Sequence, residues 1–182
     1  ANIGIVVNGN LNLLDALNSS DTASIYTTTD LTLDNNSKTI SSNAVYLGSL
    51  GDVVVNGTNA INGANSVNVH AGKNIKLQAG TLSSATINLR SYNGAIEGAS
   101  VFALNAPVVN ATAAGNILLD SKENQLQQVN VSNTSGSITV GNGNTTNAAL
   151  NIAITTPNSI VGGDLTVHNY RAGNANNIIL AN

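Results

Sequence analysis

Two histidines are the first side chains in this sequence that could support catalysis or metal binding. They are His70 and His168, and Asp164 and Arg171 lie close to His168 along the chain. A general base or a metal ligand needs partners within reach, and neither histidine belongs to a metal-binding motif. We therefore expect two solvent-facing imidazoles on strands.

A second group of charged residues could cleave polysaccharides, because β-helical lyases and hydrolases gather carboxylates with Arg or Lys on one sheet. The candidates are Arg90, Glu97, Asp120, Lys122 and Glu123. We expect no second carboxylate beside Glu97. Asp120 and Glu123 straddle Lys122 at a predicted corner, which is typical of a solvated turn. We therefore predict no enzymatic activity, no catalytic residue, no cofactor and no metal site.

Sequence motifs for covalent modification and ion binding are weaker evidence of function. Asn56, Asn110, Asn130 and Asn144 are among the residues that begin an Asn-x-Ser/Thr sequon, but a chain this rich in Asn, Ser and Thr contains several by chance, so glycosylation stays open. Calcium-binding Gly-Gly-x-Gly-x-Asp repeats are absent. The run Thr27–Thr29 lacks the repeated flat array that ice binding would require.

The elements that would position these side chains follow a repeat. The positions of Ile75, Ile96, Ile117 and Ile138 increase by a constant step of 21. Each lies in a short run with alternating apolar residues, which is the pattern of a strand rather than a helix. A fixed period of this size is typical of a solenoid, and we predict one β-helical turn per repeat.

Apolar residues at equivalent positions are predicted to stack inside the solenoid, because alternate side chains of a strand point to opposite faces. The predicted core stack is Ile75, Ile96, Ile117 and Ile138 in the first strand of each turn, and Ile87, Val108, Val129 and Leu150 in the second. A third, weaker apolar site lies near Leu82, Val101–Leu104 and Leu126. Three short strands per turn predict a roughly triangular cross-section.

Polar residues are predicted to repeat on the outside and at the corners. Stacked amides can hydrogen-bond along the axis, and the expected outward Asn ladder is Asn68, Asn88, Asn130 and Asn151, interrupted by Val109. The turn glycines Gly51, Gly94, Gly115 and Gly136 precede the first strand by two positions. We expect them to adopt positive φ at little cost.

These patterns predict an all-β fold: a single-stranded, right-handed parallel β-helix with roughly 21 residues per turn and eight or nine turns. The right-handed sense follows the general crossover rule, and the strand spacing predicts a rod about 40 Å long. We expect one domain over 1–182, with less regular turns in 1–50, regular repeats in 51–155 and looser turns in 156–182. An antiparallel sandwich would not predict a fixed period.

Composition restricts the partners. Charged residues make up 8% of the chain, against about 25% in an average domain. Six Lys and Arg residues are too few for a nucleic-acid surface. No apolar run approaches the ~20 residues of a membrane helix. The chain begins at Ala1, so we expect a processed product or a segment of a longer protein.

The repeats resemble the shaft of filamentous haemagglutinin-like exoproteins, which are bacterial adhesins, haemolysins and contact-dependent inhibition toxins secreted by the two-partner pathway. The resemblance rests on Gly-x-Ile-x-Leu runs such as Gly115–Leu119 and on the segment Glu123–Val131. It covers about 51–155 and implies a right-handed β-helix and cell-surface export. The Asn-Pro-Asn motifs of that family's secretion domain do not occur in this sequence.

We therefore predict a structural β-solenoid segment of a secreted or surface-exposed bacterial adhesin or biofilm matrix protein. Its expected partners are neighbouring solenoid segments, copies of itself, and host or matrix glycans. An alternative is a subunit of an extracellular filament that stacks head-to-tail through its end strands. A polysaccharide-degrading enzyme is the third hypothesis.

Overall fold

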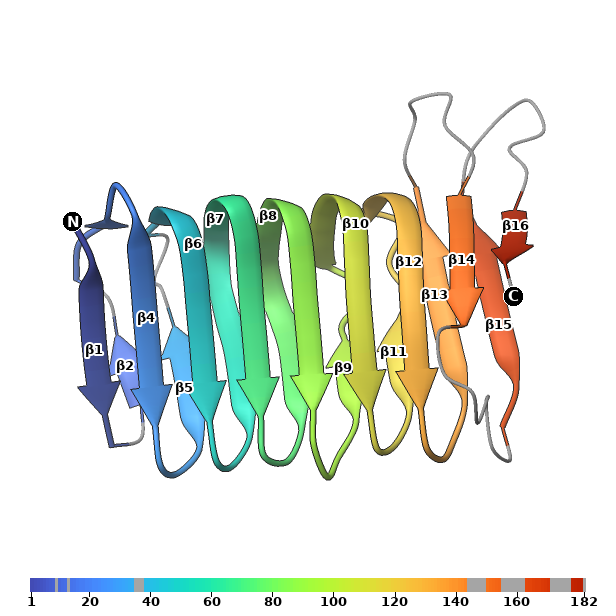
Figure 1. Cartoon of the computed structure of the whole chain (residues 1–182), viewed down its shortest axis with the longest axis horizontal. Coiled ribbons are helices and arrows are strands. Elements are labelled where there is room, and N and C mark those ends of the chain that lie inside the picture. Colours follow the sequence, from blue (N-terminus) through green and yellow to red (C-terminus); the bar gives the residue numbers. More distant parts are fainter. Residues whose placement is uncertain are drawn as a thin grey trace.

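The computed structural model is a β-solenoid. It describes residues 1–8, 10–12, 14–34, 38–143, 150–154, 163–170 and 178–181, and for 58–59, 150–154 and 178–181 it describes the backbone alone. No helix occurs in the described part of the chain, and so none that could cross a membrane. The predicted parallel β-helical fold is confirmed, with strands stacked side by side along one axis (Figure 1).

One ladder of the solenoid consists of nine parallel strands. In order along the axis they are β1 (Ile3–Val7), β4 (Thr22–Thr27), β6 (Ile40–Ser49), β7 (Val53–Ala71), β8 (Ile75–Ser91), β10 (Phe102–Ala113), β12 (Gln125–Asn133), β14 (Leu150–Ile154) and β16 (Ile178–Ala181). The N- and C-termini lie near opposite ends of this stack (Figure 1).

Shorter strands form the ladder behind it. They are β2 (Asn10–Asn12), β5 (Leu31–Asp34), β9 (Ile96–Gly98), β11 (Ile117–Leu119), β13 (Ile138–Asn142) and β15 (Leu165–Asn169), with β3 (Leu17–Asn18) paired to β6. β7 and β8 are long enough to run through both ladders, pairing with β5 and β9 at their first residues. The second and third predicted strands of each turn are therefore largely continuous.

The regular part amounts to about six turns, slightly fewer than the eight or nine predicted. The repeat lengthens toward the C-terminal end. Gln128 pairs with Asn151, a step two positions longer than predicted, and Ile138 pairs with Leu165, a step six positions longer.

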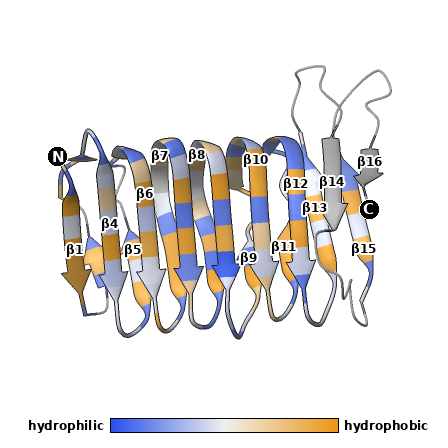
Figure 2. Ribbon diagram, viewed as in Figure 1, coloured by the Kyte–Doolittle hydropathy of each residue, from blue (hydrophilic) through white to orange (hydrophobic). Residues whose placement is uncertain are grey.

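Apolar side chains stack along the interior. Ile75, Ile96, Ile117 and Ile138 pair in register and are at most 1% exposed, as predicted. Bands of hydrophobic and hydrophilic residues alternate along the strands (Figure 2), because a pleated strand sends successive side chains to opposite faces. Truncating one such isoleucine to alanine typically costs about 2–5 kcal/mol.

The second predicted stack is wrong at Val108. Val109, not Val108, is fully buried in register between Ile87 and Val129. The step from Ile87 to Val109 is one position longer than predicted, and the step from Val109 to Val129 is one position shorter, so a constant step misses Val109. Val108 is half-buried on the outer side.

The same stack continues at Ile152 rather than at Leu150. Ile152 is the register partner of Val129, and Leu150 pairs with Ile178 instead. The step from Val129 to Ile152 is two positions longer than the predicted one, so the last predicted step also falls short.

A ladder of side-chain oxygens lines one corner, and we call it the corner ladder: Asp30, Asp52, Asn74, Asn116 and Ser137. A side-chain oxygen of each residue accepts a hydrogen bond of 2.8–3.2 Å from a backbone N–H one turn further along the solenoid. The donors are, in the same order, the N–H groups of Asp52, Asn74, Ala95, Ser137 and Asp164. Burial tends to raise the pKa of the Asp52 carboxyl, but hydrogen bonds from Lys76 and Asn74 lower it overall.

This ladder explains the turn glycines better than backbone conformation does. Only Gly136 of the four adopts a positive φ, of 80°, so the expectation is wrong for the other three. A Cβ at Gly51, Gly94 or Gly136 would collide with an oxygen of the corner ladder. At Gly115 the nearest atom would lie 3.4 Å away, because the preceding corner residue there is alanine.

Candidate functional site

Asparagine side chains form a hydrogen-bonded row on the outer face of the nine-strand ladder. The Nδ2 atoms of Asn88, Asn110 and Asn130 donate to the Oδ1 atoms of Asn68, Asn88 and Asn110, at 2.8, 2.7 and 2.6 Å. We call Asn68, Asn88, Asn110 and Asn130 the amide ladder. Its continuity through β7, β8, β10 and β12 ties four successive turns together.

The amide ladder differs from the predicted set at two positions. Asn110 fills the predicted interruption, because burial of Val109 sends the next side chain outward. Asn151 does not extend the ladder: it pairs with Gln128, and Ala153 is the register partner of Asn130. The sequon residues Asn110 and Asn130 therefore use their amides in the ladder, and Asn144 lies outside the described residues.

The side chains in the same outer row change in type toward the N-terminus. Asn68 is followed in register by Tyr46 on β6 and Ser24 on β4. In the neighbouring outer row, Tyr26, Gly48, His70 and Arg90 follow one another on β4, β6, β7 and β8. Amides thus give way to aromatic rings and glycines within one or two turns.

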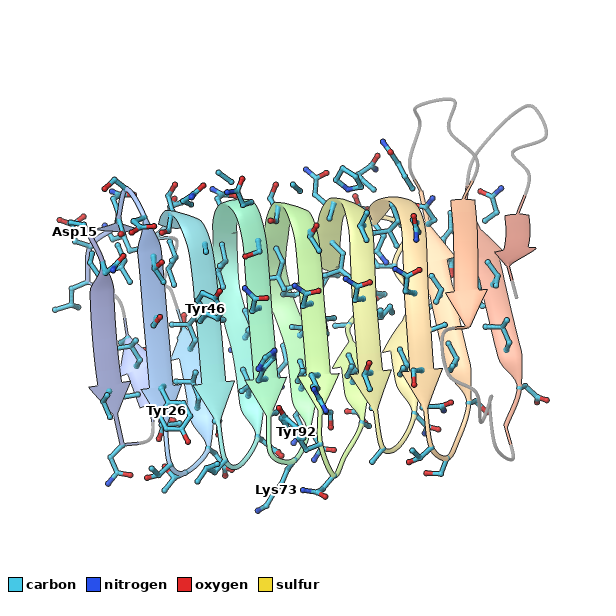
Figure 3. All side chains as sticks on the ribbon, viewed as in Figure 1. Asp15, Tyr26, Tyr46, Lys73 and Tyr92 are labelled. Carbon is cyan, nitrogen blue, oxygen red and sulfur yellow. The ribbon has the colours of Figure 1, made fainter. Side chains whose placement is uncertain are left out.

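These two rows and the adjoining turn enclose a hollow of about 520 Å³. We call it the tyrosine groove, and its lining includes Tyr26, Tyr46, Leu50, His70, Tyr92, Gly48 and Gly72. Tyr26, Tyr46 and Tyr92 are 40%, 45% and 51% exposed, and Leu50 is 61% exposed. Figure 3 shows the three tyrosines on one side of the solenoid, over the region from β4 to β8.

Glycines give the groove its depth. A Cβ added to Gly48 would lie 2.9 Å from Cδ2 of Tyr26, so the ring packs directly over this glycine. A Cβ at Gly72 would collide with the carbonyl oxygen of Leu50. Glycine at position 48 therefore leaves room for the Tyr26 ring, and glycine at position 72 lets the chain approach the backbone of Leu50 closely.

The groove carries little charge. Its lining contains no carboxylate among the described residues. The Arg90 guanidinium carbon lies 4.5 Å above the centre of the Tyr92 ring, a cation–π arrangement. Partial burial, and secondarily the charge of Arg90, lowers the pKa of His70, which favours the neutral imidazole.

A second cluster joins residues far apart in sequence, and we call it the Asp120 cluster: Asp120, His168 and Tyr170. His168 Nδ1 lies 2.9 Å from Asp120 Oδ2, and the Tyr170 hydroxyl donates to Asp120 Oδ1 at 2.8 Å. The hydrogen bond to Asp120 raises the pKa of Tyr170. The cluster spans two turns because Gly141 lies between them, in register with His168.

The Asp120 cluster borders a more open hollow of about 690 Å³ whose lining includes Lys122 and Glu123. Three of the charged residues considered for polysaccharide cleavage therefore meet there. Glu97 lies on β9 beside Leu118, and Arg90 lies at the tyrosine groove. Asp120 takes His168 and Tyr170 as partners rather than a second carboxylate. No group of three metal-ligating side chains occurs in the described part of the chain.

Sequence reasoning missed the tyrosine groove. One signal was available, since the chain has only four tyrosines and one phenylalanine, and three of those tyrosines fall between positions 26 and 92. Their convergence depends on which rows and turns lie side by side.

Comparison with known proteins adds no identity: the chain matches no protein-family model, no curated protein and no solved structure.

Proposed function

We propose that this chain is a structural β-solenoid segment of a bacterial cell-surface or secreted adhesin or matrix protein. It acts as a rigid rod that also presents an adhesive outer face. The observation that carries this proposal is the continuous stacking of parallel strands, with side chains bonded from turn to turn inside and outside the backbone ladders.

Each regular turn is held to the next by three kinds of contact. Backbone hydrogen bonds connect the strands, apolar side chains stack in the core, and the amide and corner ladders add side-chain bonds. Bending such a rod would strain all three at once. This redundancy suits a spacer that transmits force or holds another domain away from a surface.

The proposed location rests on resemblance and surface chemistry. The Gly-x-Ile-x-Leu runs resemble shaft repeats of filamentous haemagglutinin-like proteins, which supports export through the two-partner pathway. The outer face is rich in amides and hydroxyls and carries few charges. Such a surface suits contacts with glycans more than with nucleic acids.

Negative-stain electron microscopy of the purified chain tests the rod. Separate straight particles about 40 Å long would support it, and compact globular or bent particles would contradict it. A filament subunit, whose copies would stack head-to-tail through their end strands, is the second candidate. Long fibres of single-subunit width would establish that candidate instead.

The enzymatic hypothesis has a separate test. Asp120 and Glu123 line one hollow, so they are the carboxylates that we would expect to act if this chain cleaved polysaccharides. We expect no depolymerisation of uronate polymers by the wild-type chain. Activity that disappears in Asp120→Ala would overturn the non-enzymatic proposal.

A further inference from the structure

We infer that the tyrosine groove is a binding site for a neutral oligosaccharide. This inference rests on the proposed adhesive function and deepens it by naming the site and the ligand class. The occupant is a short segment of an uncharged glycan chain, lying along the solenoid axis between β4 and β8.

The aromatic content of the groove is the first argument. Aromatic residues are 3% of the chain, yet three of its four tyrosines line this one hollow. Phe102 is buried in the core, so the solenoid places its tyrosines outside rather than using them as filling. Tyrosine residues that are 40–51% exposed offer apolar surface with a polar tip. The C–H faces of pyranose rings fit such surfaces.

Unused hydrogen-bonding groups are the second argument. The hydroxyls of Tyr26, Tyr46 and Tyr92 have no hydrogen-bond partner among the described residues. The Tyr170 hydroxyl, in contrast, bonds Asp120. Neutral His70 adds a donor and an acceptor to the groove lining. A few polar groups around an apolar floor are typical of small-ligand sites.

Charge selects the class of glycan. No carboxylate and no guanidinium line the groove among the described residues, and the guanidinium of Arg90 lies over the ring of Tyr92, which does line it. Recognition therefore depends on stacking and hydrogen bonds rather than on ion pairs. An acidic polysaccharide or a charged peptide would find few complementary charges, whereas a neutral glycan needs none.

The length of the groove favours an oligosaccharide over a single sugar. Tyr26 belongs to β4, and Tyr92 follows β8, three strands further along the axis. Three strand spacings correspond to about 14 Å. Beyond β8 the amide ladder continues the same face with half-buried amides, so a longer glycan would leave the rings and meet polar groups.

Tyrosine fluorescence gives a direct test because the chain contains no tryptophan. The full chain is titrated with neutral oligosaccharides of glucose, mannose and N-acetylglucosamine, and with oligogalacturonate as an acidic probe. We expect saturable binding of at least one neutral probe that is insensitive to salt. Tyr46→Ala and Tyr92→Ala should each weaken it by about tenfold, the scale of one lost aromatic contact.

Tyr170→Ala is the matched control, because it removes an exposed tyrosine at the other hollow and should leave affinity unchanged. Tyr46→Phe should retain most of the affinity, since it keeps the ring. Circular dichroism checks that each variant is folded. The inference is overturned if no neutral probe binds, if binding survives removal of all three groove tyrosines, or if only oligogalacturonate binds and Arg90→Gln abolishes it. Straight rods without glycan binding would leave the proposed rod intact.

Discussion

The tyrosine groove and the Asp120 cluster show two uses of one structural device. In both, a glycine occupies an outer strand position, Gly48 in the first and Gly141 in the second, and aromatic or charged side chains from neighbouring turns reach over it. In the cluster, the polar groups satisfy one another. In the groove, the tyrosine hydroxyls form no hydrogen bond with another described residue.

This difference indicates a structural role for the Asp120 cluster and a binding role for the tyrosine groove. A glycine that lets Asp120 reach Tyr170 and His168 joins turns that are not adjacent, and so stabilises the final turns of the solenoid. A glycine that lets a ring lie flat beside an open hollow stabilises little but creates a surface for a ligand. The two hollows should therefore respond differently to the same substitutions.

Glycine replacement should give the largest contrast. A Cβ at Gly141 would lie 2.8 Å from Cε2 of Tyr170 and 2.9 Å from the backbone nitrogen of Ser121, and would collide with Asp120. Because backbone cannot move aside cheaply, we expect Gly141→Ala to destabilise the chain by about 1–3 kcal/mol. Chemical denaturation monitored by circular dichroism measures this change.

Gly48→Ala is the matched comparison. Its new Cβ would meet only the Tyr26 ring, a side chain that can swing outward. We expect a loss below about 1 kcal/mol, together with weaker glycan binding as the ring leaves its place. Equal destabilisation by Gly141→Ala and Gly48→Ala would contradict the distinction between a stabilising Asp120 cluster and an open tyrosine groove.

Removing one charge should have a smaller effect on stability. Asp120→Asn keeps the shape of the cluster but weakens its bonds to His168 and Tyr170, which are exposed. We expect only a slight loss, because exposed ion pairs contribute little. The pKa of Tyr170 should fall toward its ordinary value, because the carboxylate raises it. Ultraviolet absorbance of tyrosinate measures the titration, and Tyr170→Phe identifies its signal.

An unchanged tyrosine titration in Asp120→Asn would show that the two side chains do not meet in solution. The corresponding control in the groove is Tyr26→Phe, which should leave the raised pKa of Tyr170 unaffected.

The comparison also shows what the sequence could predict. Repeating types predicted the stack from Ile75 to Ile138, because identical residues at a constant interval must lie in equivalent environments. The prediction of Val108 was wrong because the step to Val109 is one position longer than predicted and the step after it is one position shorter. A shift of one position moves a side chain to the opposite face of the sheet.

Neither hollow could be predicted from the repeat in the sequence. Asp120 and His168 are separated by 48 residues, and their contact needs a glycine between them and a repeat that lengthens at this end of the solenoid. The three groove tyrosines occupy three different positions of the repeat, so no periodic pattern relates them. Periodicity predicts what is alike between turns, whereas these sites are formed by departures from it.

Acid should produce the smallest effect, and it distinguishes the two histidines. The pKa of His70 is lowered by partial burial and by Arg90, so the folded chain binds a proton less readily than the unfolded chain does. As pH falls below the ordinary histidine value of about 6.5, the unfolded state takes up protons first, and stability decreases until the folded-state pKa is passed. The effect is small because much of the His70 side chain still reaches solvent. Melting temperatures in this range should decline less in His70→Gln than in the wild type, while His168→Gln, which leaves the groove unchanged, should retain the His70 contribution. If His70→Gln does not reduce the decline, the folded chain does not favour the neutral form of His70, and His70 is not the neutral donor and acceptor that the groove would offer a glycan.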